Sequence, residues 1–203
     1  MEIDEVPRTR MPAAERRELI LRDATAVFAS NGYGGTTTDL VAKAAGVSQP
    51  YVVRMFGTKE KLFLAVLERA ERILAETFRA AIPGPDGHER RERMGMAYVG
   101  LIAERGLHQV LMQAFLLGGD PVVGPEARAS FLRIWRLTID EAGMSEEDAR
   151  SFIANGMLIN TLVALRLGDA YGADPDIDAM FTVAFPCSFD VFKDSLPTAA
   201  ERY

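Results

Sequence analysis

The sequence contains very little of the chemistry that disulfide-rich, metal-binding or catalytic proteins use. Its 203 residues include one cysteine, Cys187, and two histidines, His88 and His108. A single cysteine cannot form an intrachain disulfide, which favours a reducing compartment, and we expect the protein to be cytoplasmic. The two histidines lack the spacing of a metal site, and no glycine-rich phosphate loop is present. We therefore expect no enzyme activity, no catalytic residue, no metal and no cofactor.

The sequence also lacks a hydrophobic run long enough for a membrane span. The uncharged segment 152–165 is shorter than the roughly 20 residues that a spanning helix requires, and it contains Asn155, Gly156 and Asn160. The first residues, Met-Glu-Ile-Asp-Glu-Val-Pro-Arg, are acidic and have no apolar core, unlike a secretory signal. We therefore expect no membrane partner.

Strand-like alternation, internal repeats and low-complexity tracts are absent as well. Apolar residues instead recur at spacings of three and four, as at Leu19, Ile20, Ala24, Val27 and Phe28, which predicts a first helix from near Pro12 to Asn31-Gly32. The chain is long enough for one small domain and one larger domain with its own core. We expect an all-α fold.

The net charge of −6 is unevenly distributed along the chain. Residues 7–66 contain nine basic and five acidic residues, a net charge of +4, which leaves −10 for the remainder. Such an asymmetry orients the positive end of a protein toward a polyanion. Arg8 and Arg10, in an N-terminal segment without periodicity, could reach phosphates or simply be solvated.

Residues 36–56 have the features of two short helices joined by a tight turn. Gly46 lies where the chain leaves the first helix and predicts a positive φ. Ser48 is placed to cap the second helix with its hydroxyl, and Pro50 falls in the first turn, where its missing N–H costs little. The apolar residues whose spacing would pack the two helices against each other are Val41, Ala45, Val47, Val52 and Met55. We interpret the stretch as a helix-turn-helix whose second helix, Gln49 to Phe56, enters a DNA major groove.

From about Arg17 to Leu67, the chain resembles the TetR family of bacterial transcriptional regulators. The resemblance rests on Ala-Val-Phe-Ala-Ser-Asn-Gly-Tyr at 26–33, Thr36-Thr37, Val-Ala-Lys-Ala-Ala-Gly-Val-Ser at 41–48, Phe56 and Thr-Lys-Glu-Lys-Leu at 58–62. It implies an N-terminal three-helix helix-turn-helix domain followed by a C-terminal helical ligand-binding and dimerisation bundle. We expect a flexible tail over 1–11, the DNA-binding domain over 12–57, a connecting helix over 58–80 and the C-terminal domain over 81–203.

The recognition helix should turn Val52 and Phe56 inward and leave its other side for DNA. Gln can pair with adenine and Arg with guanine in the major groove. The resemblance further implies phosphate contacts from Thr37 and Lys59, although Thr37 could act only as a helix cap and Lys59 only as a solvated lysine. The candidate DNA-binding residues are Thr37, Ser48, Gln49, Pro50, Tyr51, Arg54 and Lys59.

The sequence departs from the family at two positions of the recognition helix. Val53 replaces the usual tyrosine that contacts phosphate, and Met55 replaces the usual histidine or tyrosine two positions later. We expect Arg54 and Tyr51 to take over part of this role.

The C-terminal part contains further predicted helices, separated by glycine and proline. The uncharged segment 152–165 and a last helix from Asp174-Pro175, interrupted at Pro186, suggest a four-helix dimer interface that resembles the family's arrangement. The candidate interface residues are Ile153, Gly156, Met157, Asn160, Ala164, Phe181 and Phe185.

Aromatic and amide side chains in this part are candidates for an effector pocket. Gln113 interrupts an apolar run, and a buried amide needs a partner that a ligand could supply. The alternative is that the aromatics form core and the amides pair with backbone. The candidate ligand-binding residues are Tyr98, Gln113, Phe115, Phe131, Trp135 and Asn155.

Together these patterns predict a ligand-responsive, sequence-specific regulator, most simply a repressor. Its partners would be a double-stranded DNA operator, a second copy of itself and a small-molecule effector. A homodimer would bind a pseudo-palindromic operator, and a small apolar or aromatic effector would release it. The alternative is a ligand-independent DNA-binding regulator whose bundle core is filled.

Overall fold

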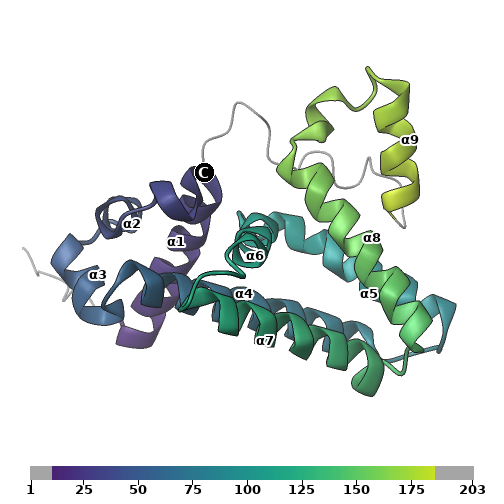
Figure 1. The fold of residues 1–203 in the computed structure, drawn as a ribbon, viewed down its shortest axis with the longest axis horizontal. Helices are drawn as coiled ribbons and strands as arrows, with labels where there is room; N and C mark the ends of the chain where they lie inside the picture. The colour runs from purple at the N-terminus through teal and green to yellow at the C-terminus, as the bar shows by residue number, and fades with distance from the viewer. Residues whose placement is uncertain (1–10, 186–203) are drawn as a thin grey trace, which may run out of the picture.

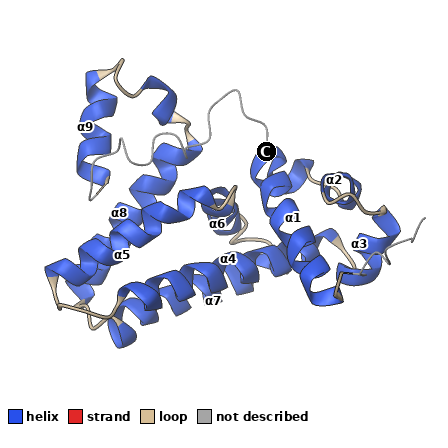
Figure 2. Cartoon of the chain, turned by 180° about the vertical axis from the view of Figure 1, so that it is seen from behind, coloured by secondary structure: helices blue, strands red, loops and turns tan. Residues whose placement is uncertain are grey.

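A computed structural model of the protein describes residues 11–185. This range folds into nine α-helices and contains no strand (Figures 1 and 2), which confirms the predicted all-α fold. None of the helices between residues 11 and 185 has the length and apolar character to cross a bilayer. Arg8, Arg10, Pro186 and Cys187 lie outside the described residues.

The first three helices form a small head at one end of the molecule (Figure 1). They are α1 (Ala13–Gly35), α2 (Thr38–Ala44) and α3 (Gln49–Phe56). The predicted apolar stripe of α1 is buried, with Ile20, Ala24 and Phe28 each at most 1% exposed. The predicted end at Asn31-Gly32 is a kink instead: Gly32 has φ 70° and ψ 167°, and helical turns resume up to Gly35.

The remaining helices form the body. They are α4 (Lys59–Ala81), α5 (His88–Gly100), α6 (Leu107–Leu116), α7 (Val123–Arg136), α8 (Glu146–Ala164) and α9 (Pro175–Ala184). Short 3-10 segments at Leu101–Ala103 and Leu167–Ala170 and a π-helical turn at Leu137–Glu141 complete the chain. Side-chain N-caps are present at the starts of α4 and α8: the Thr58 hydroxyl accepts from the Lys61 N–H, and the Ser145 hydroxyl accepts from the Asp148 N–H.

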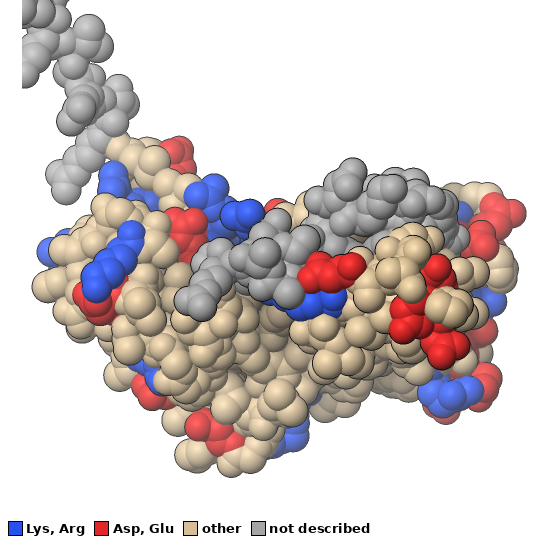
Figure 3. Space-filling model, turned by 90° about the horizontal axis from the view of Figure 1, so that it is seen from above, with Lys and Arg blue, Asp and Glu red and all other residues tan. Residues whose placement is uncertain are grey.

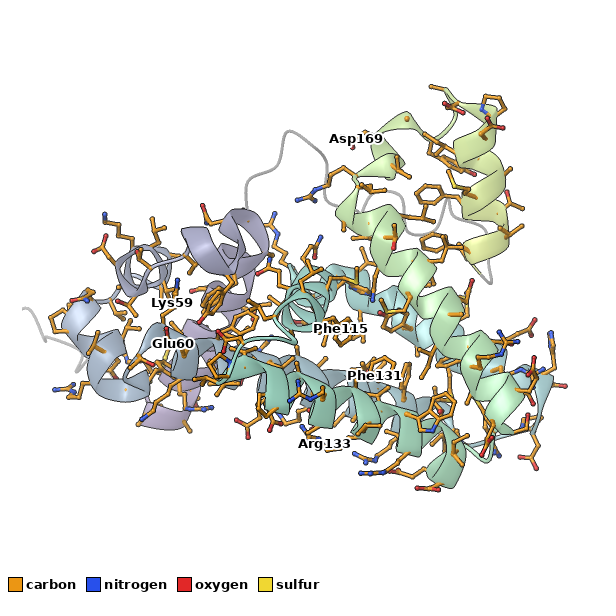
Figure 4. The ribbon with its side chains drawn as sticks, viewed as in Figure 1. Lys59, Glu60, Phe115, Phe131, Arg133 and Asp169 are labelled. Carbon is orange, nitrogen blue, oxygen red and sulfur yellow. The ribbon has the colours of Figure 1, made fainter. Side chains whose placement is uncertain are left out.

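Helices α4 and α7 lie side by side along the body and are joined by ion pairs (Figures 1 and 4). Arg133 on α7 donates from Nε to Glu71 Oε1 on α4 at 2.5 Å and from Nη2 to Glu126 Oε1 at 2.5 Å. These hydrogen bonds raise the pKa of the Arg133 guanidinium above its ordinary value. Arg79 makes a two-pronged contact with Glu141, with both distances 2.7 Å. The two helices therefore form one wall of the body.

The core of the head extends onto the first turns of α4. Phe63 on α4 packs edge-on against Phe28, with ring centroids 4.9 Å apart, and against Tyr33, at 5.1 Å. Phe28 and Phe63 have no exposed surface. Helix α4 thus starts inside the head and ends in the body, so any change in its tilt moves the head.

A buried arginine connects the head to the body. Arg69 on α4 has a side chain only 8% exposed. Its Nε donates to Glu18 Oε1 on α1 at 2.6 Å, and its Nη2 to Glu104 Oε2, in the segment before α6, at 3.5 Å. A buried charge needs such partners, because its desolvation is otherwise costly. Arg69 therefore holds α1, α4 and the α5–α6 connection together.

Helix α6 makes a second connection to α1. Gly106, which precedes α6, has φ +82°, and a Cβ on it would lie 2.6 Å from Ala29 Cβ and 2.9 Å from the Thr25 carbonyl oxygen. The side-chain Nε2 of Gln113 donates to the Phe28 carbonyl at 2.8 Å. Both contacts are kept only while the backbones of α1 and α6 stay close together.

Candidate functional site

The turn between α2 and α3 has the predicted geometry. Gly46 has φ +63°, and the Val47 N–H donates to the Ala42 carbonyl at 3.0 Å, which closes the end of α2. Ser48 occupies the N-cap position of α3, but its side chain makes no capping hydrogen bond, contrary to expectation. Its carbonyl instead accepts from the Tyr51 N–H at 3.0 Å, and its side chain is exposed.

The predicted bounds and inward face of α3 are confirmed. The helix runs from Gln49 to Phe56, with Val52 fully buried and Phe56 8% exposed. The side chains left at its surface are Gln49, Pro50, Val53 and Arg54. Tyr51, expected to face outward, is half-buried and packs partly on the core, because its ring lies beside α1 and the turn before α3.

Two contacts hold the polar side chains of α3. The guanidinium carbon of Arg54 lies 5.1 Å from the centre of the Tyr51 ring, within the range of a cation–π contact. Gln49 donates from Nε2 to the Thr38 hydroxyl at 3.2 Å, which ties the start of α3 to α2. Arg54 and Gln49 are thus exposed at the same surface while each retains an internal contact.

The two candidate phosphate contacts lie at helix starts. The Thr37 hydroxyl accepts from the Leu40 N–H at 3.2 Å and so caps α2, while the residue itself remains exposed. Lys59, at the start of α4, donates from Nζ to the Tyr33 carbonyl at 3.0 Å, and the same atom lies 4.6 Å from the centre of the Tyr33 ring. The ammonium of Lys59 is therefore held against the end of α1.

The two positions that depart from the family differ in exposure. Val53 is 40% exposed on the surface of α3. Met55 is half-buried and packs against the core of the head. Only the valine is therefore placed at the surface that carries Gln49 and Arg54.

The body contains a cavity of about 290 Å³. Helices α4 to α8 all contribute to its wall, and four of the six candidate ligand-binding residues line it: Tyr98, Phe115, Phe131 and Asn155. Figure 4 shows Phe115 and Phe131 between the helices of the body. Residues that the sequence did not single out for the pocket also line it, among them Leu74, Phe78, Leu111, Ser130, Ile134 and Phe152.

Two candidate pocket residues do not line the cavity. Gln113 points to α1, where its Nε2 binds the Phe28 carbonyl, and its buried Oε1 has no hydrogen-bond partner. Trp135 is half-buried against the core. Gln113 lies on α6 and Trp135 on α7, two helices that contribute other residues to the cavity wall. Ile134, next to Trp135 in the chain, is one of those lining residues.

The structure also redistributes the candidate interface residues. Ile153, Gly156, Met157 and Asn160 line the cavity. Phe181 and Phe185 are buried within the subunit, at 0% and 4% exposure, with their rings stacked at 5.3 Å. One face of the uncharged segment of α8 therefore packs on its own body. Ala164 is exposed.

Tyr98 and Asn160 form the buried polar contact of the cavity. The Tyr98 hydroxyl donates to Asn160 Oδ1 at 2.5 Å, and the two side chains are 7% and 3% exposed. Burial raises the pKa of the Tyr98 hydroxyl well above its usual range. This pair is therefore uncharged at physiological pH.

His108 packs behind Tyr98 and predicts a pH-dependent stability. Burial lowers the pKa of its imidazole to about 4, and a hydrogen bond to the backbone of Tyr98 opposes this only in part. In the unfolded chain the imidazole of His108 has an ordinary pKa near 6.5, so it binds a proton at pH values where the folded protein does not. The stability contributed by neutral His108 is therefore fully present above about pH 6.5 and is lost as the pH falls toward 4. The loss attributable to His108 is about 3 kcal/mol.

Urea unfolding across this pH range measures the effect. His108→Leu should reduce the pH dependence, whereas His88→Gln, whose side chain is 74% exposed, should leave it unchanged. Equal pH dependence in His108→Leu and the unaltered protein would contradict the assignment.

Comparison with known proteins places the head in an established family. Residues 20–66 match the family model described as bacterial regulatory proteins, tetR family. The chain is 37% identical over 84 residues to the HTH-type transcriptional activator FasR of Mycolicibacterium smegmatis, covering 41% of this chain and 38% of FasR. It is 41% identical over 66 residues to the HTH-type transcriptional repressor AcnR of Corynebacterium efficiens, covering 32% and 35%. The matched segments thus span little more than a third of these two relatives.

The similarity in fold extends over most of the chain. A TetR-like transcriptional regulator from a Rhodococcus species superposes with a TM-score of 0.63 at 24% identity, covering 86% of this chain and 94% of that one. The sequence match covers the head, and the structural match covers head and body together. Residues 20–66 thus match the TetR family of bacterial transcriptional regulators, and the fold of the chain resembles that of a TetR-like regulator.

Proposed function

We propose that the protein is a homodimeric, sequence-specific DNA-binding regulator whose affinity for its operator is controlled by a small molecule. The observation that carries the proposal is the combination of an exposed recognition surface on α3 with a cavity in the body. The homodimer would place two α3 helices in successive major grooves, about 34–36 Å apart, on a pseudo-palindromic operator. The two curated relatives include one activator and one repressor by name, and we propose repression as the simpler mode.

The electrostatics of the chain support DNA binding by the head. Figure 3 shows basic and acidic side chains interspersed over the end that holds the head, and a cluster of acidic side chains toward the opposite end, where basic ones are also present. The first turn of α9, at that opposite end, contains Asp176 and Asp178 beside the cap Asp174. This polarity would orient the head toward the DNA phosphates.

Dimerisation through α8 and α9 is supported by their exposed apolar side chains. Leu165 is 63% exposed, Val183 74% and Met180 37%. Contiguous exposed apolar side chains mark interaction surfaces in many soluble proteins. The proposed subunit contact therefore uses this outer face, together with Ala164, in place of the buried Phe181 and Phe185.

Coupling between cavity and DNA is proposed to run through α6. Leu111 and Phe115 on α6 line the cavity, while Gln113 on the same helix binds the Phe28 carbonyl in the head. A ligand that displaces α6 would change this contact and the nearby Arg69 pairs. It would release DNA by binding more tightly to the displaced state than to the DNA-binding state.

Fluorescence anisotropy on DNA from upstream of the protein's own gene tests the proposal. A shuffled duplex serves as the control, and each titration is repeated at several salt concentrations. Saturable binding that favours the upstream DNA, with two or four chains per duplex, is expected. If the upstream DNA shows no preference, selection from random duplexes decides, and failure to enrich any sequence would contradict specific DNA binding.

Replacing Lys59 should weaken DNA binding without changing sequence preference. Lys59→Ala removes a charge placed at the start of α4, so operator and random DNA should lose affinity alike, and the salt dependence should fall by about one counterion per subunit. Arg150→Ala, on α8 in the body, where the side chain is 63% exposed and pairs with Glu147 of the same helix, is the control and should leave both quantities unchanged. A loss confined to the operator would assign Lys59 to base recognition instead.

A further inference from the structure

The charged residues of the cavity are confined to one end. His88, Arg91 and Glu92 lie in the first turns of α5, and Asp148 lies in the first turn of α8. Arg91 Nη1 and Asp148 Oδ1 form an ion pair of 2.9 Å across this rim. Beyond the rim, the lining residues are apolar or neutral, so a charged ligand group placed there would lose its hydration without gaining a counter-ion.

The interior of the cavity nevertheless offers a hydrogen-bond donor. Asn160 Oδ1 accepts from the Tyr98 hydroxyl, while the Asn160 amide nitrogen contacts only the Met157 sulfur at 3.9 Å. A thioether is a weak acceptor, and a buried amide normally finds a stronger one. Asn160 is only 3% exposed, and it lines the cavity. Its amide is therefore placed to donate to an uncharged ligand oxygen.

The wall on the α6–α7 side is formed by two aromatic side chains. Phe115 on α6 and Phe131 on α7 meet edge to face, with ring centroids 5.6 Å apart and planes at 88° (Figure 4). The same two rings and Met157 also line a second hollow of about 530 Å³ at the surface. Its other walls are Gly118, Ala127, Arg128 and Leu132. Rotation of one ring would join the two spaces.

Apart from Arg128, the outer hollow is apolar, and it is open to solvent. Phe131 is 37% exposed and Leu132 46%. The inner cavity alone lies at the small end of the usual range for small-molecule sites, about 300–1,000 Å³. An occupant that continues into the outer hollow would bury these exposed side chains and gain apolar contact that a compact ligand cannot reach.

From this geometry we propose that the effector is an elongated, uncharged molecule with one oxygen function, bound by Asn160 and Tyr98, and an unbranched apolar chain that passes between Phe115 and Phe131 into the outer hollow. The proposal rests on the ligand-responsive regulator proposed above and specifies the chemistry of its effector. It distinguishes this occupant from a compact aromatic molecule, which would fill only the inner cavity, and from a carboxylate, which the neutral interior disfavours.

A homologous series of straight-chain primary alcohols, from hexanol to tetradecanol, tests the proposal on the full-length protein. Binding is measured by displacement of an environment-sensitive dye and by the shift in thermal unfolding. Affinity should rise about three- to fourfold for each added methylene, as expected for burial of a CH₂ group, until the outer hollow is filled. Fatty acids of the same lengths should bind at least tenfold more weakly. Affinity independent of chain length, or equal affinity for acids and alcohols, would overturn the proposal.

Three variants separate the two ends of the ligand. Leu132→Glu places a charge on the exposed wall of the outer hollow and should abolish the gain from the longer chains while sparing the shortest alcohols. Asn160→Leu should weaken every alcohol about tenfold and keep the length dependence. Tyr98→Phe, which retains the ring, should weaken the alcohols to a lesser extent, and it tests the polar end should Asn160→Leu fail to fold. Unchanged binding in both polar variants would refute the recognition of the oxygen.

Three further outcomes decide between the proposals. If Leu132→Glu changes the oligomeric state and leaves the chain-length dependence intact, the outer hollow is a subunit contact and the proposal is wrong. Operator binding is measured separately: specific DNA binding without alcohol binding rejects only the proposed effector. Alcohol binding without any specific DNA binding would retain the proposed ligand chemistry and reject the regulator.

Discussion

Gly106→Ala should destabilise the protein by about 2–5 kcal/mol, because it combines two separate costs. Gly106 has φ +82°, a conformation in which an L-residue is strained by about 1–2 kcal/mol. The new Cβ would also lie 2.6 Å from Ala29 Cβ and 2.9 Å from the Thr25 carbonyl oxygen. Overpacking of this kind typically costs about 1–3 kcal/mol, since α1 and α6 must move apart.

Gly172→Ala is the matched control for this variant. Gly172 has the same φ of +82°, but a Cβ added there meets no atom within 4 Å. The difference between the two losses, measured by urea unfolding, isolates the close approach of α6 to α1. Equal losses would mean that the contact adapts without cost, and α6 would then be a poor candidate for transmitting a signal to the head.

The variants Gly106→Ala and Gly172→Ala should also differ in their affinity for the operator. If α6 couples the cavity to the head, Gly106→Ala should also lower operator affinity in the absence of effector, since the variant mimics a displaced α6. Gly172→Ala should bind the operator as the unaltered protein does. This prediction depends on the proposed function, whereas the stability difference does not.

The local signals in the sequence were sufficient for the bounds and the inward face of α3. The placement of Gly46, Pro50, Val52 and Phe56 depends on neighbours within one helical turn. The structure confirms the predicted bounds of α3. Ser48 was misjudged because a serine at an N-cap can leave its hydroxyl in solvent while its carbonyl begins the helix.

The body was less predictable because helical periodicity shows which residues share a face but not what that face contacts. Gln113 was correctly singled out as an unusual amide in an apolar run, yet its partner is a carbonyl of α1, 85 residues earlier in the chain. Gly156 and Asn160, in the uncharged stretch of α8, were predicted at a subunit contact, and both meet Tyr98 within the same subunit. Such pairings depend on how the helices are arranged in three dimensions.

The helical pattern after residue 136 also concealed a local change. Helix α7 ends at Arg136, and a π-helical turn follows over Leu137–Glu141. The Ala142 N–H donates to the Leu137 carbonyl, five residues earlier, at 3.0 Å, which is the hydrogen-bond register of a π-helix. Apolar spacing does not distinguish a π-turn from a regular turn, so this feature could not be found from the sequence.

Arg54→Ala should cause the largest loss of operator affinity, about 1–3 kcal/mol for each half-site of the operator. Arg54 is the basic side chain of α3 and is exposed at its surface beside Gln49. An arginine that reads guanine with two hydrogen bonds contributes to specific binding far more than to random DNA. Anisotropy with operator and shuffled duplexes measures both affinities. Equal losses on the two duplexes would show that Arg54 contacts only phosphate.

Two further variants distinguish the geometry of Arg54 from its charge. Arg54→Lys keeps the charge and removes the planar fork, so the salt dependence should persist while operator preference falls. Tyr51→Phe keeps the ring that lies 5.1 Å from the guanidinium, whereas Tyr51→Ala removes it. If the ring orients Arg54, Tyr51→Phe should retain most of the operator affinity and Tyr51→Ala should approach Arg54→Ala, with no additional loss when both residues are replaced. Additive losses would instead mean that Tyr51 contacts DNA independently, as the sequence alone suggested.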